Sequence, residues 1–203
     1  ELANAGLLGL AAPESVDGAG LTTLETVAVA TELGRGLARV PYGAHAIAGV
    51  PLVAEHASDE LSGRLLESLV SGSAVLTAAV EEDGNFSALA PRVTLTGGAL
   101  RGAKVNVPYA TAADVLLVTA EAASGAVVAV VPTDRDGVTI TETVATGLSP
   151  VFTVEFDGVA VAESELLGGG HATVAQALDL LRLAVSADQA GTVEAALAAA
   201  SPE

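Results

Sequence analysis

The sequence contains no cysteine among its 203 residues, which removes several classes of chemistry at once. Disulfides, thiolate metal sites and thiol catalysis all need cysteine and are therefore excluded. The lack of disulfides also fits a reducing compartment, and we expect a cytoplasmic protein. A chain of this length buries on the order of 70% of its unfolded surface, so it can form a core without crosslinks.

Basic residues are scarce as well. The chain has 8 Lys and Arg against 25 Asp and Glu, which gives a formal net charge of -17. Such a charge repels phosphate backbones and anionic lipid surfaces, so we expect no nucleic-acid partner. Although 51% of the residues are hydrophobic, a charge or a glycine breaks every apolar run well before the about 18 residues of a membrane helix, and we expect no membrane insertion.

Aromatic residues make up only 2% of the chain, so Ala, Val and Leu must form most of the core. Side chains of this size suit close packing of helices. The sequence begins without Met in ELANAGLLGL, which has the pattern of the middle of a helix, and a strongly helical run ends at Ser201-Pro202-Glu203. We interpret the chain as a piece of a longer protein.

Hydrophobic spacing of about 3.6 residues indicates helices near both ends of the chain. Thr22 or Thr23 can cap the first helix, Ser58 or Asp59 can begin the third, and Gly72 can end it. The first 72 residues are therefore predicted to be helical, and helix returns at the end. The four predicted helices cover residues 22–39, 43–56, 59–71 and 171–200.

After Gly72 the period changes from 3.6 toward 2, and short β-branched runs alternate with Gly, Pro or Asp. The runs are VLTAAV, RVTLTG, ALRGAKVNVP, DVLLVTAE, AVVAVVPT, GVTITETV and FTVEFDGVAV. So many short strands predict a small antiparallel barrel or sandwich. The fold class is thus α+β, with a helical domain at 1–72, a β domain at 73–168 and the start of a second helical region at 169–203.

Several longer segments follow one another at characteristic spacings: GLLGLAAPESVDGAGL, ETVAVATELGR, LTGGALRGAKVNVPYATAADVLLVTA, FTVEFDGVAVAESELLGGG and AVSADQAGTVEAAL. In this order they resemble the acyl-CoA dehydrogenase family. They look like the turn after an early helix, the next helix, the central hairpin, the last barrel strand with its exit, and the first long helix of the C-terminal bundle. The resemblance covers nearly the whole chain.

The resemblance implies an FAD enzyme that removes two hydrogens from the α and β carbons of an acyl-CoA, in fatty-acid or steroid side-chain catabolism. In the family, a carboxylate on the C-terminal bundle takes the α proton while flavin N5 accepts the β hydride. We assign no catalytic base here and expect it beyond Glu203. The implied partners are an acyl-CoA substrate, an acceptor like the electron-transfer flavoprotein, and further subunits in a homo- or hetero-oligomer, as a dimer or tetramer.

The stretch TAAVEEDGNFSALAP at residues 77–91 corresponds to a family motif that begins Thr-Glu-Pro and continues through a small-residue turn to Ser. Val80, Glu81 and Glu82 occupy the first three positions, and Phe86 occupies that of the Ser. At VNVP, many members carry Trp-x-Thr. The resemblance implies cofactor contacts, some of them through backbone N–H groups, from Thr77, Ala79, Val80, Glu81, Asn106, Val107 and Pro108, and substrate contacts from Asn85 and Phe86.

Other interpretations stay open. Most loops with the composition of residues 81–86 are only solvated turns, and three carboxylates there would oppose a pyrophosphate. The departures from the motifs favour a degenerate partner subunit, structural or regulatory, in a mixed assembly with an active homologue. Acyl-CoA oxidases and some flavin monooxygenases share the fold. A flavoenzyme of any kind requires that the strand ending at Val80 and the strand through Asn106 face one shared cleft.

The remaining patterns predict structure rather than chemistry. Gly34-x-Gly36 and Gly168 to Gly170 do not follow a strand as nucleotide loops do, so we interpret them as helix termini and a hinge. The histidines lack the spacing of metal ligands, and we expect no metal. No Ser lies in a G-x-S-x-G context. For the one basic cluster, pairing with carboxylates is favoured over contact with CoA or FAD phosphates; its members are Arg92, Arg101 and Lys104.

Overall fold

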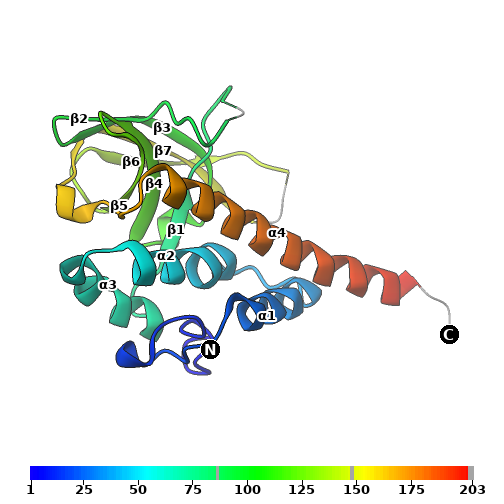
Figure 1. The fold of residues 1–203 in the computed structure, drawn as a ribbon. Coiled ribbons are helices and arrows are strands. Elements are labelled where there is room, and N and C mark those ends of the chain that lie inside the picture. Colours follow the sequence, from blue (N-terminus) through cyan, green and yellow to red (C-terminus); the bar gives the residue numbers. More distant parts are fainter. Residues whose placement is uncertain (86, 147–148, 201–203) are drawn as a thin grey trace.

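A computed structural model describes residues 1–85, 87–146 and 149–200 of the chain. Helices precede and follow a seven-stranded sheet, which confirms the α+β class and the order helices, strands, helix (Figure 1). The helical elements are η1 (Glu14–Val16), α1 (Thr23–Arg35), η2 (Gly43–Gly49), α2 (Val50–His56), α3 (Asp59–Ser71), η3 (Ala110–Ala112), η4 (Glu163–Glu165) and α4 (His171–Ala200). The strands are β1 (Leu76–Ala79), β2 (Thr94–Thr96), β3 (Ala99–Pro108), β4 (Val115–Ala122), β5 (Gly125–Pro132), β6 (Val138–Thr143) and β7 (Val151–Ala160).

The helix ends form where the local sequence predicts them. Thr22 caps α1 by accepting a hydrogen bond from the Leu24 N–H at 3.2 Å, and Glu25 accepts one from the Thr22 N–H at 2.9 Å, which completes a capping box. Ser58 caps α3 in the same way, and Gly72 ends it in the left-handed conformation. These predictions are confirmed because a cap depends on a few adjacent residues.

The amino-terminal segment is not the helix interior that its pattern predicts. Residues 1–12 form turns, and only η1 has a short helical turn. Gly6 has a φ of +71°, which ends any helix there, and Gly9 lies so close to Val70 that a Cβ would overlap with its side chain. Glycine also disfavours helix intrinsically. The prediction that all of the first 72 residues are helical is therefore wrong for this segment.

The helix predicted over residues 43–56 divides into a π-helical turn, η2, and a short α-helix, α2. The Val50 N–H donates to the His45 carbonyl five residues earlier, which is the wider π spacing. Pro51 has no N–H and so cannot donate to the Ile47 carbonyl as an α-helix would require. The wider turn accommodates this missing donor.

The sheet is mixed rather than wholly antiparallel. The hairpins β2/β3, β4/β5 and β6/β7 are antiparallel as predicted, but β1 and β2 each pair with β4 in parallel. Leu76 of β1 lies opposite Val115 of β4, a strand far along the chain. A sequence pattern indicates which strands form hairpins but not which distant strands become neighbours, so the antiparallel prediction was wrong for these two pairs.

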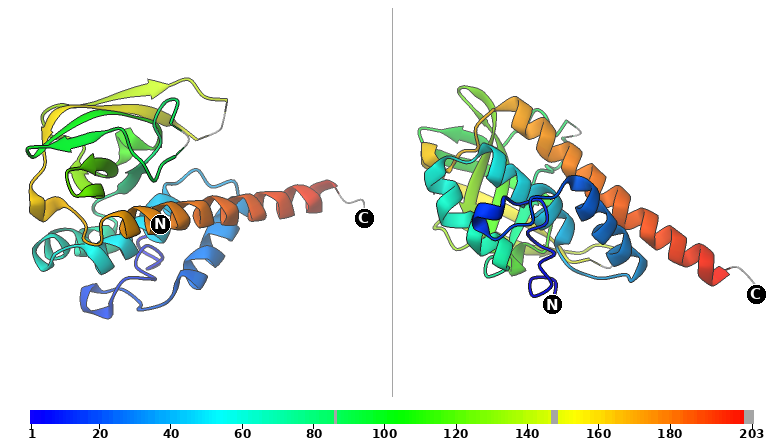
Figure 2. Two further views of the ribbon diagram at one scale, coloured as in Figure 1. Left: turned by 45° about the horizontal axis from the view of Figure 1, so that its top comes forward. Right: turned by 60° about the horizontal axis from the view of Figure 1, so that its bottom comes forward.

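Helix α4 runs along the boundary between the sheet and the amino-terminal helices, and its carboxy-terminal part projects beyond the sheet (Figures 1 and 2). One core cluster joins the helices to one face of the sheet, and it includes Leu52, Leu66, Leu76 and Val174. A second cluster fills the curved sheet itself. Within the described residues, no helix is both long and apolar enough to cross a membrane. The domain boundaries at 72 and 168 stay predictions.

Helices α1 and α4 cross with their backbones in close approach. A Cβ at Gly34 would overlap with the backbone oxygen of Asp188, and a Cβ at Gly191 would overlap with that of Thr31. Thr192 reinforces the crossing because its hydroxyl donates to the Gly34 carbonyl at 3.1 Å. Gly34 is therefore a packing residue at the end of a helix, as its sequence context predicts, and not part of a nucleotide loop.

We expect Gly34→Ala to destabilise the protein by about 1–3 kcal/mol, because an added methyl group at a backbone crossing forces the two helices apart. Gly63→Ala is the matched control, since Gly63 lies within α3 and a Cβ added there would meet nothing within 4 Å. That change should stabilise the protein by up to about 1 kcal/mol through helix propensity. Urea unfolding gives the free energy of unfolding of both variants. Equal changes in this free energy would contradict the role of Gly34 in the helix crossing.

Candidate functional site

A cavity of about 490 Å³ lies where the ends of β1 and β3 meet α4 and the segment after α1. Its size lies within the range of small-molecule sites. The sheet contributes Ala78, Val80, Glu81, Val105, Asn106, Pro108 and Tyr109, with Ser149 beside them. The helical side contributes Ala30, Leu33, Leu37, Ala38, Arg39, Val40, Pro41, Tyr42, Gly43 and Ala44 together with Leu181, Ala184, Val185, Asp188, Gln189 and Thr192 of α4.

The strand ending near Val80 and the strand through Asn106 face this one cavity, as a flavin site requires. Val80, Glu81, Asn106 and Pro108 line it, so the fold brings together four of the residues predicted to contact a cofactor. The other three, Thr77, Ala79 and Val107, are buried and do not line the cavity. Their contact with a cofactor stays a prediction.

The wall of the cavity on the sheet side is shaped by an irregularity in β3. The register between β3 and β7 shifts between Lys104 and Val107, and Asn106 adopts a φ of +53°. A bulge of this kind redirects a side chain and often lies next to a functional site. Here it turns the Asn106 amide toward Glu81, to whose carboxylate it donates at 2.9 Å. The Val105 N–H donates to the Glu81 carbonyl, also at 2.9 Å, which joins the two strands.

Thr77 and Tyr109 hold the end of β3 in place. The Thr77 hydroxyl donates to the Pro108 carbonyl at 2.7 Å, so this residue supports the wall from behind. Tyr109 follows with a φ of +54°, and its hydroxyl lies 3.2 Å from that of Ser149. Thr77 therefore positions a neighbouring residue that lines the cavity.

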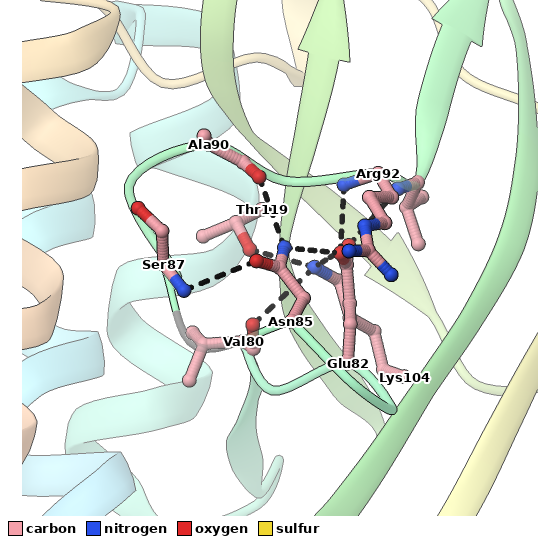
Figure 3. Close-up of polar contacts among 9 residues, drawn as sticks. Val80, Glu82, Asn85, Ser87, Ala90, Arg92, Lys104 and Thr119 are labelled. Carbon is pink, nitrogen blue, oxygen red and sulfur yellow. Dashed lines mark hydrogen bonds and ion pairs between the residues drawn. The ribbon is translucent and has the colours of Figure 1, made fainter.

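A buried ion pair joins Lys104, where the irregularity of β3 begins, to Glu82 in the turn after β1 (Figure 3). Lys104 Nζ is fully buried and lies 2.7 Å from Glu82 Oε1, and it also donates to the Thr119 hydroxyl at 2.8 Å. The Glu82 carboxylate accepts three further hydrogen bonds, from the backbone N–H groups of Arg92 and Val93 and from the Asn85 amide. Both carboxylate oxygens of Glu82 thus have partners, which is the condition for keeping charges inside a protein.

Burial by itself would raise the pKa of Glu82, but hydrogen bonds from Lys104, Val93, Asn85 and Arg92 outweigh it and lower the pKa from 4.5 to about 2. Burial lowers the pKa of Lys104, while the Glu82 carboxylate opposes that shift. Because each charge would be buried alone if the other were neutralised, we describe the pair as ionised. Glu82 therefore carries a compensated charge, and it adds less to the repulsion of an anionic ligand than its sequence context suggests.

The turn after β1 is anchored through Glu82 and Asn85, although Glu81, Asp83 and Gly84 are exposed. Asn85 donates from its amide to Glu82 and to the Ala90 carbonyl, each at 2.9 Å, and accepts from the Ser87 N–H at 3.0 Å. These bonds occupy its polar atoms, and Asn85 does not line the cavity. Its contact with substrate stays a prediction. Phe86, the other residue predicted to contact substrate, lies outside the described residues.

The predicted basic cluster separates into different environments. Arg101 pairs with Asp157 on the exposed surface of the sheet at 2.6 Å, whereas Lys104 pairs with Glu82 in the interior. Both therefore pair with carboxylates, the favoured of the two interpretations. Arg92 donates to the Gly84 carbonyl at 3.3 Å. Among the described residues, Arg39 is the one basic side chain that lines the cavity, and the sequence patterns did not single it out.

Unusual backbone conformations gather at this cavity. The non-glycine residues with positive φ in the described chain are Asp17, Leu37, Asn106 and Tyr109. The last three all line the cavity. Strained conformations persist where the surrounding structure enforces them, and they are frequent at functional sites. This concentration identifies the cavity as the candidate site independently of any resemblance.

Most of the helical side of the cavity was missed from sequence. The sequence pattern predicted a helix at α4, and three residues of one stripe along it, Leu181, Val185 and Gln189, line the cavity. The change along this stripe from leucine and valine to glutamine is the one signal that distinguishes a cavity wall from a core. The segment from Leu37 to Ala44 carried no recognisable motif.

His45 has a structural role. His45 is buried, its Nδ1 accepts from the Leu76 N–H at 3.0 Å, and its Nε2 lies 2.9 Å from the Leu69 carbonyl. Burial lowers its pKa, with the Leu69 contact opposing the shift, and the two partners fix the neutral tautomer that is protonated on Nε2. Within the described ranges, no group of three or more His, Asp or Glu side chains is placed to hold a metal.

This chain is similar to known proteins in sequence. The N-terminal domain family of acyl-CoA dehydrogenases matches residues 1–73. Acyl-CoA dehydrogenase FadE27 of Mycobacterium tuberculosis is 37% identical over 174 residues, which cover 86% of this chain and 47% of that protein. The chain therefore spans about half the length of this curated relative.

Two solved structures are similar over nearly the whole chain. The ChsE4-ChsE5 complex from Mycobacterium tuberculosis matches with a TM-score of 0.88 and 36% identity, covering 97% of this chain and 54% of the matched one. The Tcur3481-Tcur3483 steroid ACAD G363A variant matches with a TM-score of 0.87 and 35% identity, with the same coverage of both chains. Each of these names joins two differently named chains.

We expect Glu82→Gln to destabilise the protein by about 3–5 kcal/mol, because it leaves the buried Lys104 ammonium without a counter-charge. The control is Asp157→Asn, which breaks the exposed ion pair between Arg101 of β3 and Asp157 of β7. It should lower the free energy of unfolding by less than about 1 kcal/mol. Urea unfolding monitored by circular dichroism measures both. If both substitutions lowered the free energy of unfolding by similar amounts, the buried ion pair would contribute no more to stability than the exposed one.

The stability difference between the wild type and Glu82→Gln should depend on pH. The folded-state pKa of Glu82 is lowered from 4.5 to about 2, so its contribution, on the order of 3 kcal/mol, is present above about pH 4.5 and is lost as the pH falls toward 2. Measurement of urea midpoints for both proteins across this range should show the curves converging in acid. A constant difference would contradict the lowered pKa.

Proposed function

Because this chain belongs to the acyl-CoA dehydrogenase family, we propose that it forms part of an FAD-dependent enzyme that oxidises an acyl-CoA thioester between its α and β carbons. The observation that carries the proposal is the cavity in which the end of β1 and the bulge of β3 face α4. Bound flavin would supply the chemistry by accepting the β hydride. The residues of this chain bind, orient and shield the reacting groups.

The sheet side of the cavity fits a flat aromatic ring. Val80 and Pro108 offer apolar surface, and the carboxylate of Glu81 and the amide of Asn106 offer polar atoms at its edge. Pro108 contributes only a carbonyl, and Thr77 already donates to it. These residues would hold the ring system, while the buried pair behind them keeps the wall rigid.

The lining of this cavity is less suited to binding the pyrophosphate of a dinucleotide. Arg39 is the one basic residue among the described residues of the lining, and Glu81 and Asp188 are acidic. Phosphates are usually bound by Arg, Lys or clustered backbone N–H groups. We propose that further phosphate contacts and the base that takes the α proton lie outside this chain, the base beyond Glu203. The cavity of this chain then forms the ring-binding part of the site.

A second candidate is a subunit that completes a mixed assembly without being active alone. It is favoured by the similarity to structures whose names join two chains and by Val80, which offers no hydroxyl where the family motif has Thr. The steroid ACAD among these relatives suggests a thioester with a steroid side chain as substrate. The final electron acceptor in either case would be a protein like the electron-transfer flavoprotein.

Purification of the full-length protein, alone and co-expressed with a second acyl-CoA dehydrogenase chain from its source, tests both candidates. We expect a flavin absorbance band and reduction of an artificial electron acceptor when an acyl-CoA is added. Activity of the protein alone supports the enzyme, and activity only in co-expression supports the partner subunit. Absence of flavin in both preparations would overturn the proposal, and stoichiometric oxygen consumption would identify an oxidase instead.

The same preparations allow a residue-level control. Asn106→Ala removes the amide beside Glu81 and should weaken flavin binding by about 2- to 10-fold, the worth of one hydrogen bond. Thr139→Ala changes an exposed residue of β6 and should leave flavin binding unchanged.

A further inference from the structure

Leu37 ends helix α1 in a conformation that leucine rarely adopts. Its φ is +51°, in the left-handed region. Its N–H donates to the Gly34 carbonyl at 3.0 Å, and the next N–H, of Ala38, donates to the Leu33 carbonyl at 2.9 Å. This pair of bonds is the Schellman motif, whose left-handed position is usually occupied by glycine because other residues are strained there by their Cβ.

The end of α3 has glycine at the corresponding position, where a Cβ would also overlap with the side chains of Ala3 and Leu8. Gly72 occupies the corresponding position with a φ of +71°, and the Ala74 N–H donates to the Ser68 carbonyl in a similar closing bond. This chain thus has glycine at the left-handed end of α3 and leucine at the left-handed end of α1. A leucine at position 37 needs a different reason.

Packing against the described residues of the chain does not provide that reason. The Leu37 side chain is 59% exposed, so little of its apolar surface is buried here. It lines the cavity together with Val40, which is 38% exposed, and Val185 of α4, which is 56% exposed. Strained residues cluster at ligand-binding sites, and Leu37 lies on the wall of a cavity, so what enters the cavity explains its conformation better than the turn does.

We propose that Leu37 is a specificity-determining residue that contacts the hydrocarbon part of the acyl thioester. The inference rests on the proposed function and adds to it a residue that selects the substrate. The hydrocarbon is favoured over the nucleotide because leucine offers no group to a phosphate and because acidic Glu81 and Asp188 line the same cavity. The left-handed backbone holds the side chain at the mouth, and binding of a large acyl group covers its exposed surface.

Three variants of the full-length protein, in its active assembly, test the proposal. Leu37→Gly and Leu37→Asn suit the left-handed backbone but remove the apolar contact, whereas Leu37→Met keeps an apolar side chain. Their affinities for butanoyl-CoA and for a large thioester, either hexadecanoyl-CoA or a steroid side-chain acyl-CoA, are measured by isothermal titration calorimetry. The large probe is the one that the wild type binds more tightly. Melting temperatures are measured in parallel.

We expect the Gly and Asn variants to bind the large thioester about tenfold more weakly and butanoyl-CoA less than about twofold more weakly. Their melting temperatures should be unchanged or higher by about 2–4 °C, because strain is relieved. The Met variant should bind both thioesters like the wild type. If Leu37 only supported the fold, its replacement would lower the melting temperature. Weaker binding of the large thioester without a lower melting temperature therefore indicates contact with substrate.

Other outcomes overturn the inference in distinguishable ways. Equal weakening for small and large thioesters would place Leu37 against the nucleotide part. Unchanged affinity for both would show that Leu37 does not contact substrate, while the proposed function stands. If the wild type binds neither thioester, the proposed function fails and this inference fails with it.

Discussion

The geometry of the cavity depends on the buried ion pair between Lys104 and Glu82. An ammonium group without exposed surface is retained only when a carboxylate and further hydrogen bonds compensate it, and here Glu82 and Thr119 do so. Lys104 lies immediately before the bulge of β3, and Glu82 lies in the turn that follows β1. The pair therefore ties together the two strands that form one wall, and the Glu81–Asn106 contact at the surface of the cavity follows from it.

The opposite wall depends on small residues. Helices α1 and α4 approach through Gly34 and Gly191, and Gly43 of the π-helical turn lies against Ala184. A chain with 2% aromatic residues fills its core with close backbone contacts instead of large rings. Such contacts leave few alternative arrangements, because an added Cβ would overlap with backbone at Gly34 and Gly191 and with the Ala184 side chain at Gly43. The sheet wall and the helical wall thus enclose a cavity at which three residues with left-handed backbone gather, Leu37, Asn106 and Tyr109.

Much of the fold could be predicted, and the failures have a common cause. The predicted bounds 59–71, 171–200 and 99–108 agree with α3, α4 and β3 because caps, periodicity and turn residues act locally. The parallel partners of β4 and the turns of residues 1–12 depend on distant contacts. In the site, Val80, Glu81, Asn106 and Pro108, predicted to contact a cofactor, line one cavity. Glu82 was interpreted as a repelling charge, because its partner lies 22 residues away.

The sequence by itself determined the order of helices and strands from local pattern and the exclusion of thiol chemistry from composition, and the resemblance of several of its segments indicated the family. Only the tertiary structure decided which carboxylate faces the cavity and which is buried. It also revealed that an ordinary leucine after α1 has a left-handed backbone and an exposed side chain. The physical reason is that burial, ion pairing and backbone strain are properties of the partners that a residue meets, and those partners come from distant parts of the chain.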